Sequence, residues 1–512
     1  MRVTSSMMTN NMMLNVNRNM RNLFQLEMQF SSTRRINVPS DNPLIAARHL
    51  KFRNNITANE DFQRNVENAL AWMDVTESAL DGVLQTLLNE IRDVINRAHN
   101  DPNPLSARNV LIEQMNHLTN QIGHQMNTRF AGRYVFSGLR TDQPPVFTQD
   151  QQHLSYRITQ NFSLGDVERT KSLQVIQPSV DTPPGVPRVH DPIHRLKLAF
   201  TNVDLAPITD PLHPDFVAGD APAMGPNITI TGSPPGNTNF IVRMRSVDDL
   251  DAYDVSWLGA DEVIYIPETG ELIFRPEDVT GAIGSANFPV EIVYERTGFH
   301  RGELNPIVNF NVDLLYAPAG NSLRHLIGQS FNMDNQDMLY EFSTHTTIPT
   351  NVLSKNVLTD KLFADLHNLI NFIRGIRPSD PALLRSALEA QFPDHTEAEI
   401  DAQMTRHFAY ETGHINAVMN DRFNNMLFLI DRHASDVRVQ VTDIGSRGRR
   451  LELMQNRLEQ DEGSLERLYT NNIAVDMARL TTLLATAEAA YMASIRVGTN
   501  IINITLANFL QV

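Results

Sequence analysis

Apolar residues recur at steps of three and four near both ends of the chain, the spacing that places them on one face of a helix. The first series predicts a helix ahead of Pro39, and its apolar positions are Met13, Val16, Met20, Leu23 and Phe30. The second series lies near the opposite end, and its positions are Met477, Leu480, Leu484, Ala487, Tyr491 and Ile502. We interpret the two series as coiled-coil seams that pack on each other, because each alone would leave its apolar face in water.

Two prolines interrupt the helical pattern in the stretch "INVPSDNP", residues 36–43. Pro39 removes a backbone donor and is expected to end the first helix. Asn42 is a good N-cap, and Pro43 suits the first position of a new helix, where its missing donor costs nothing. We therefore interpret Pro39, Ser40, Asp41, Asn42 and Pro43 as a linker between a terminal segment and the rest of the chain.

The longest apolar series follows this linker and predicts a second helix that runs to about residue 98. Its members are Met73, Leu80, Leu84, Leu87, Ile91, Val94 and Ala98. A third helix is predicted from Pro104, with Leu111, Met115, Leu118 and Ile122 at the same spacing. The short link at 99–104 makes the two helices antiparallel neighbours.

The middle of the chain has a different pattern, with many prolines, glycines and β-branched residues between about 146 and 350. Residues 129–147 read as a strand, and 239–247 and 287–299 predict further strands. Residues 262–276 predict a hairpin that turns at 268–270.

Helical periodicity returns after residue 351, with helices predicted at 358–375, 381–391 and 396–433 and a long final section from about 430. The predicted fold class is mainly α with an inserted β-rich domain, in which the N- and C-terminal segments form a long antiparallel helical bundle or coiled coil. We assign three domains to the chain. These are terminal coiled-coil segments (1–42 and 472–512), a helical core (43–148 and 351–471) and a β-rich outer domain (149–350), which a proline-rich stretch at 206–226 would divide in two.

Composition and charge argue against several classes of protein. The chain has 512 residues, no cysteine and a net charge of −16. Its acidity is concentrated in residues 201–300, which argues against a nucleic-acid partner. We find no signal-peptide pattern at the N-terminus and no run of 18 apolar residues for a membrane helix.

Candidate chemical sites are weak. His407, Glu411 and His414 would share a helical face, and His190, Asp191 and His194 lie close together in sequence, but neither set has the spacing of a zinc motif. The acidic run 248–254 lacks the glycine and final glutamate of a calcium loop. No phosphate loop or nucleophile elbow is present in the sequence. We therefore predict no catalytic, cofactor-binding or metal-binding residue, and no enzyme activity.

Four stretches resemble the flagellin and hook-associated superfamily of flagellar axial proteins, and within it the hook–filament junction (FlgL) family. They are "MRVTSSMM" (1–8), "INVPSDNP" (36–43), "GRYVFSGLRTDQPPVF" (132–147) and the terminal helix sequence at 473–510. The similarity covers residues 1–147 and 430–512. The family linker has an aspartate where this chain has Asn42. The stretches 149–350 and 378–425 show no such similarity.

The resemblance implies an extracellular structural protein of the bacterial flagellum that is exported by the flagellar type III system without a cleaved signal peptide. It implies terminal helices that order on assembly into a ring and a β domain that faces outward. The implied partners are copies of the chain, a neighbouring hook-associated junction protein, flagellin and an export chaperone that holds the C-terminal helix. The resemblance implies neither a nucleic-acid nor a membrane partner.

Two alternatives remain open at this stage. The chain could be a flagellin, the filament subunit itself, which shares the terminal helices but lacks the sequence at 132–147. It could instead carry an enzyme or a surface adhesin on residues 149–350.

Overall fold

The computed structural model describes residues 5–100, 105–174, 188–207, 223–232, 239–247, 249, 251–259, 261–279, 289–376 and 378–509. The chain divides into two compact units. The first unit joins Met1–Asn68, Glu341–Thr347 and Arg450–Val512, and the second joins Ala69–Tyr340 and Ile348–Arg449.

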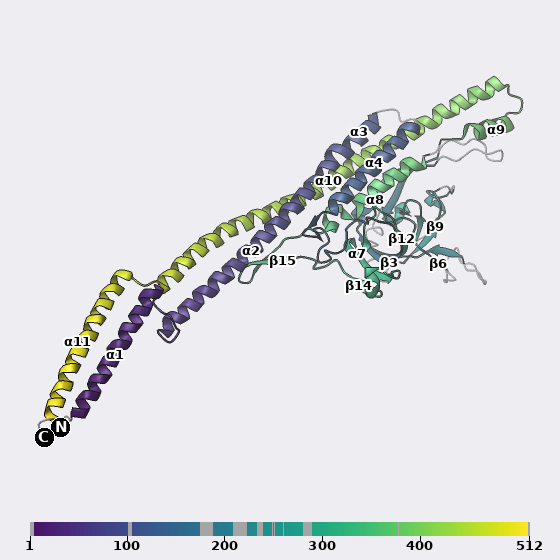
Figure 1. Ribbon diagram of the computed structural model, residues 1–512. Coiled ribbons are helices and arrows are strands. Elements are labelled where there is room, and N and C mark those ends of the chain that lie inside the picture. Colours follow the sequence, from purple (N-terminus) through teal and green to yellow (C-terminus); the bar gives the residue numbers. More distant parts are fainter. Residues whose placement is uncertain are drawn as a thin grey trace. The chain divides into compact units, whose positions relative to one another are not determined.

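The chain is mainly helical, and its strands lie in the middle of the sequence (Figure 1). This arrangement confirms the predicted fold class. The principal helices are α1 (Ser5–Ser32), α2 (Pro43–Gln85), α3 (Arg92–Asn100), α4 (Leu105–Met126), α8 (Ser354–Gly375), α9 (Pro381–Gln391), α10 (Glu397–Ile473) and α11 (Met477–Phe509), with short turns α5 (Pro276–Val279) and α7 (Pro306–Asn309).

Most strands of the described residues belong to one ten-stranded sheet in the order β14-β13-β3-β12-β8-β9-β10-β11-β5-β4. Its neighbours pair antiparallel, except that β9 and β10 run parallel. The strands of the sheet are β3 (Gln151–Phe162), β4 (Glu168–Gln174), β5 (Arg188–Lys197), β8 (Ile228–Gly232), β9 (Asn239–Met244), β10 (Glu262–Ile266), β11 (Glu271–Phe274), β12 (Val290–Phe299), β13 (Asn311–Tyr316) and β14 (Ser330–Phe331). Two-stranded pairs outside it are β1 (Arg129–Phe130) with β2 (Arg133–Tyr134), β6 (Leu205–Pro207) with β7 (Met224–Pro226), and β15 (Leu339–Ser343) with β16 (Thr346–Pro349).

The long apolar series after the linker forms part of the core of the second unit, as its spacing predicts. Met73, Leu80 and Leu87 on this series are buried, and so are Met115 and Ile122 of α4. A π-helical turn at Thr86–Ile91 joins α2 to α3 and keeps Leu87 and Ile91 inside. The predicted antiparallel neighbours α3 and α4 are in contact.

The final helical section differs from the sequence prediction in its continuity. The predicted helix at 396–433 and the section from 430 are one helix, α10, which runs without interruption for 77 residues. Gly445, Gly448 and Gly463 lie inside this helix and do not break it. A glycine weakens a helix interior by only about 1 kcal/mol, which the packing of its neighbours can offset.

Residues 129–147 are not the strand that their β-branched and aromatic composition predicts. Only β1 and β2 form there, because Ala131, Gly132 and Gly138 adopt positive φ angles of 48°, 81° and 59°, which turn the chain. The side chain of Asn127 then fixes the segment's end, since it donates to the Val146 carbonyl at 2.9 Å and accepts from the Val146 amide at 3.1 Å.

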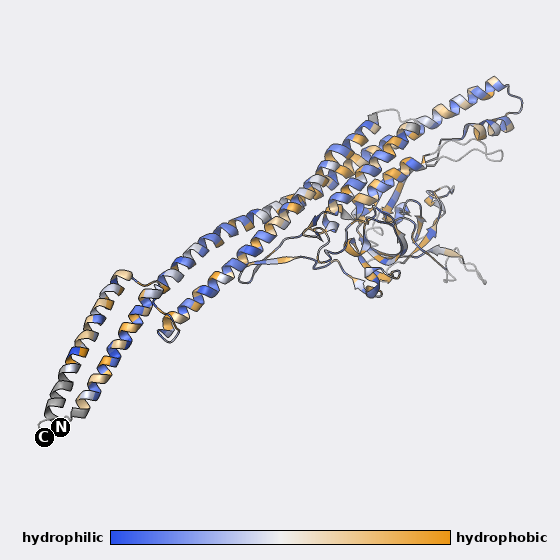
Figure 2. Ribbon diagram, viewed as in Figure 1, coloured by the Kyte–Doolittle hydropathy of each residue, from blue (hydrophilic) through white to orange (hydrophobic). Residues whose placement is uncertain are grey.

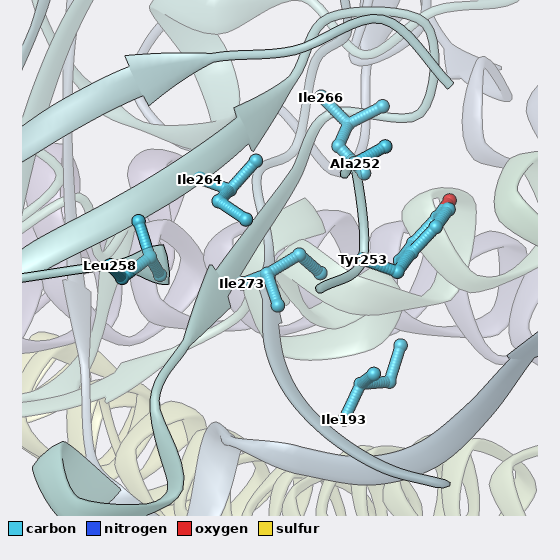
Figure 3. Packing of buried hydrophobic residues seen from close by; sticks show 7 residues of the cluster. All are labelled: Ile193, Ala252, Tyr253, Leu258, Ile264, Ile266 and Ile273. Atoms are coloured by element: carbon cyan, nitrogen blue, oxygen red, sulfur yellow. The ribbon is translucent and has the colours of Figure 1, made fainter. Parts of the chain in front are cut away.

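The predicted hairpin at 262–276 is confirmed as β10 and β11, which turn through Gly270 at a φ of 68°. The two strands contribute Ile264, Ile266 and Ile273 to an apolar cluster (Figure 3). Other elements complete the cluster, and their residues are Ile193, Ala252, Tyr253 and Leu258. Burial of these branched side chains is the main stabilising term for this part of the sheet.

We expect Ile273→Ala to destabilise this cluster by about 2–5 kcal/mol, because a fully buried isoleucine would leave a cavity. Hydrogen–deuterium exchange of peptides covering 262–274 measures the loss as faster exchange. Ile327→Ala is the matched control, since Ile327 is exposed. Equal protection of these peptides in the two variants would show that the cluster does not hold the hairpin.

Candidate assembly surface

The first and last helices of the chain pack side by side and antiparallel within the first unit (Figure 1). The more buried positions of each helix follow a three-and-four spacing, as in a coiled coil. On α1 they are Thr9, Met12, Val16, Asn19, Leu23, Leu26, Gln29 and Ser32, and on α11 they are Leu480, Leu484, Ala487, Tyr491, Ser494 and Gly498. The predicted packing of the two chain ends on each other is thus present in the structure.

Two contacts fix the register of the pair. The Tyr491 hydroxyl lies 3.9 Å from the sulfur of Met20. A Cβ added at Gly498 would lie 2.7 Å from Cε of Met12, so the missing side chain lets the two helices approach closely. Leu480 is the most enclosed apolar residue of the pair.

A second set of apolar side chains on the same two helices faces solvent. Along both helices, apolar and polar residues alternate in short stretches (Figure 2). On α1 this set contains Met7, Met8, Met13, Leu14, Met20, Phe24, Met28 and Phe30, and on α11 it contains Met477, Leu483, Met492, Ile495 and Val497. Phe24 is 63% exposed and Met20 is 52% exposed. Many exposed large apolar side chains on two neighbouring helices are a feature of interaction sites.

The residues predicted from the sequence as assembly positions divide between the two sets. Val16 and Leu23, with Leu480, Leu484 and Tyr491, lie in the seam between α1 and α11. Exposed positions are taken by Met13, Met20, Phe30 and Met477. Ile502 belongs to α11, but its side chain lies outside the described residues. Whether any of them contacts a neighbouring subunit stays a prediction.

The sequence prediction missed seam positions that are polar or small. Thr9 and Asn19 on α1, and Ser494 and Gly498 on α11, carry no hydrophobic signal. Their only signal is position, because each lies three or four residues from another seam member.

A short backbone bridge joins the segment that follows α1 to the segment that precedes α11. Arg34 and Ala474 form an isolated antiparallel bridge, the Arg35 amide donates to the Ile473 carbonyl at 2.7 Å, and the Val475 amide donates to the Thr33 carbonyl at 3.3 Å. The bridge ties the linker after α1 to the linker between α10 and α11.

The linker itself is organised by Asp41. Its carboxylate accepts hydrogen bonds from the amides of Asn37 at 2.9 Å and Val38 at 3.1 Å. These two bonds lower the pKa of Asp41, with the Val38 amide as the larger cause. The carboxylate therefore stays ionised at neutral pH and holds the turn that contains Pro39 and Ser40.

Asn42 caps α2 as predicted, since its side-chain oxygen accepts from the Ile45 amide at 3.2 Å and α2 begins at Pro43. The prediction that Pro39 ends the first helix is wrong. The helix ends at Ser32, because Thr33 adopts a left-handed φ of 58° and the next residues pair with 473–475.

The described histidine set, His407, Glu411 and His414, is not arranged as a metal site. Within the described part of the chain, no cluster of three His, Cys, Asp or Glu side chains is placed to hold a metal ion. Glu411 is instead buried and accepts from the amide of Ser379 at 2.9 Å, while His407 lies 3.8 Å from its other oxygen. The side chains of His190 and Asp191 lie outside the described residues.

The acidic run at 248–254 has structural roles at each described carboxylate. Asp249 accepts from the Ser246 amide at 2.8 Å, and Asp251 forms an ion pair with Arg245 at 2.9 Å. Asp254 caps a short 3₁₀ turn by accepting from the Ser256 amide. Asp248 and Leu250 lie outside the described residues.

No helix among the described residues combines the length and apolarity that crossing a membrane requires.

Comparison with protein families identifies the N-terminal part of the chain. Residues 3–141 match the model of the bacterial flagellin N-terminal helical region. The resemblance of this part to the flagellin superfamily is thereby confirmed. Among curated proteins, no match was found.

Solved structures of flagellar proteins are similar to this chain at low identity. One, from Vibrio parahaemolyticus and described as flagellar hook-associated, is 12% identical with a TM-score of 0.36, covering 85% of this chain and 100% of its own. FlgL from Xanthomonas campestris is 8% identical, with a TM-score of 0.31. The similarity covers 82% of this chain and 99% of the Xanthomonas chain. Flagellar hook associated protein-3 from Legionella pneumophila is 12% identical, with a TM-score of 0.30. The similarity covers 82% of this chain and 97% of the Legionella chain.

We expect Asn42→Ala to destabilise the first turn of α2 by about 1 kcal/mol, because the Ile45 amide loses its acceptor. Hydrogen–deuterium exchange of residues 43–50 measures this as a roughly fivefold increase in exchange rate. Asn54→Ala is the matched control, since Asn54 is exposed within the same helix. An unchanged exchange rate in the first turn would contradict the capping role of Asn42.

Proposed function

We propose that this chain is a structural subunit of the bacterial flagellum that joins the hook to the filament and assembles with copies of itself. The observation that carries this proposal is the pairing of α1 with α11. α1 lies in the region that matches the flagellin N-terminal model, and both helices leave many large apolar side chains in solvent. Exposed apolar side chains of this kind mark an interaction site, and an identical subunit supplies a matching surface.

The physics of the pair supports folding on assembly. A pair of helices buries only one seam, and the seam of α1 and α11 includes Thr9, Asn19 and Ser494. Such a pair is marginal in water until further helices cover its outer face. We infer that residues 1–42 and 472–512 complete their packing only in the assembled ring. The helical core (43–148 and 351–471) and the β-rich outer domain (149–350) would fold beforehand.

The absence of cysteine in the sequence suits a chain that is threaded unfolded through an export channel. We propose export by the flagellar type III system without a cleaved signal peptide, with a chaperone on the C-terminal helix and the flagellum outside the cell as the destination. The partners in place would be a neighbouring hook-associated junction protein and flagellin. We assign no catalytic role to the chain.

Flagellin, the filament subunit, is the alternative function. The family match covers a region that flagellin has by definition, so it does not separate the two. The sequence at 132–147 favours the junction role, because it resembles the junction family at a place where flagellins differ. An adhesin or enzyme carried on residues 149–350 has no described site that favours it.

Deletion of the gene separates the junction role from the filament role. We expect electron microscopy to show cells with hooks but without filaments, and immunoblots to show flagellin shed into the medium. A flagellin deletion would instead leave no filament protein in the medium. Intact filaments on the deleted strain would exclude both roles.

A second experiment tests the exposed apolar face. We expect Phe24→Glu, supplied to the deleted strain, to be exported but not to restore filaments, because a charge at a 63% exposed position does not disturb the seam but blocks an apolar contact. Gln25→Glu is the matched control, since it adds the same charge at the neighbouring exposed position. Filaments restored equally by both alleles would contradict assembly through this face.

A further inference from the structure

A cavity of about 320 Å³ lies in the second unit, between strands β4 and β5 on one side and helices α8 and α10 on the other. Its size falls in the range of small-molecule sites. Part of its wall is apolar and consists of Leu369, Phe372, Met426, Phe428 and Leu429. The remaining wall is charged, with more basic than acidic side chains.

Three of the carboxylates that line the cavity, those of Asp166, Glu168 and Asp365, form ion pairs with lysines. Lys197 lies 2.9 Å from Glu168 and 2.8 Å from Asp365, whose second oxygen lies 2.8 Å from His433. Burial alone would raise the pKa of Asp365, but Lys197 and His433 hold it well below its usual range. Asp365 is therefore a fixed negative charge that its own two partners neutralise.

Arg195 occupies the other carboxylates of this network. It forms an ion pair with Glu168 at 3.1 Å and a second with Glu271. The Arg195 side chain is almost fully enclosed, and so is that of Glu271. Neither acid has an oxygen within ion-pair distance of a further arginine among the described residues.

Arg422 of α10 lines the same cavity and has no such partner. Its residue is 8% exposed, yet its guanidinium makes no hydrogen bond or ion pair with any described residue. The guanidinium carbon lies 4.9 Å from the centre of the Phe372 ring, which holds the group in place. Thr170, also lining the cavity and 5% exposed, has a hydroxyl without a partner in the described part of the chain.

The charge on Arg422 is costly where it lies. Burial lowers the pKa of Arg422 to about 10, and repulsion from Arg195 adds to the effect, while Glu271 attracts it from beyond ion-pair distance. The group therefore remains protonated at neutral pH. A buried charge without a hydrogen-bonded partner destabilises the protein, and an anion in the cavity would remove that cost.

We propose that this cavity binds a small organic molecule that carries a carboxylate on an apolar body, with Arg422 as the group that binds the carboxylate. A planar guanidinium offers two parallel N–H donors that match the two carboxylate oxygens. The apolar wall, including the exposed Phe428, receives the rest of the molecule. The site is independent of the assembly helices, because every lining residue belongs to the second unit.

The test is calorimetric titration of the purified full-length chain at neutral pH with 2-naphthoate, and with 2-naphthamide as the uncharged probe of the same shape. We expect measurable binding of naphthoate and at least tenfold weaker binding of the amide. Inorganic phosphate serves as a third probe, and we expect it to bind more weakly than naphthoate because it has no apolar body.

Variants locate the binding in this cavity. Arg422→Met should weaken naphthoate binding at least tenfold, whereas Arg438→Met, an exposed arginine of the same helix, should leave it unchanged. Phe428→Ala should weaken binding several-fold. The Phe428→Ala variant is expected to fold normally, because Phe428 is 71% exposed. This variant therefore tests the site even if Arg422→Met does not fold.

Three outcomes would overturn the proposal. They are no binding of naphthoate at millimolar concentration, equal binding of naphthoate and its amide, and equal loss in the Arg422 and Arg438 variants. Tighter binding of phosphate than of naphthoate would also contradict it, because the apolar wall would then have no role. None of these results bears on filament assembly, which the deletion strain tests separately.

Discussion

The backbone bridge between Arg34 and Ala474 is the constraint on which the terminal pair depends. It brings together residues that are 440 positions apart in the sequence. As a result, the end of α1 lies next to the beginning of α11. Because the bridge fixes where α1 ends and where α11 begins, the seam between them has one register, with Met12 beside Gly498 and with the sulfur of the exposed Met20 near the Tyr491 hydroxyl. A slip of one residue would turn Met12 and Gly498 out of the seam, since helical faces repeat every three to four residues.

Much of this fold could be predicted from periodicity, and its failures have definite physical causes. The long series through Leu80 and Leu87 gave the correct helix and the correct buried face, because many apolar residues agree on one stripe. The end of α1 was misplaced because Pro39 is a strong local signal, whereas the real end at Ser32 depends on pairing with residues 473–475. Pairing over such a distance leaves no local trace in a single sequence.

The charged cavity illustrates the same limit more severely. Glu168, Lys197, Asp365 and Arg422 come from three separate regions of the chain, and none has a motif around it. They line one cavity only because the order of the sheet places β4 and β5 at one edge, near α8 and α10, and among them only Arg422 is left without an ion pair in the described part of the chain. Buried ion pairs contribute little net stability, but loss of one partner leaves a costly charge. The network is therefore better understood as a constraint on geometry than as a source of stability.

The composition of the exposed face on α1 bears on how a junction subunit would work. Most of its members are methionines, among them Met7, Met8, Met13, Met20 and Met28. Methionine is flexible and polarisable, so it packs against surfaces of different shape with little loss of contact. A filament subunit meets only identical neighbours, and rigid branched side chains would serve it well. A subunit between two different structures must pack against unlike neighbours above and below, and an adaptable methionine face meets that requirement.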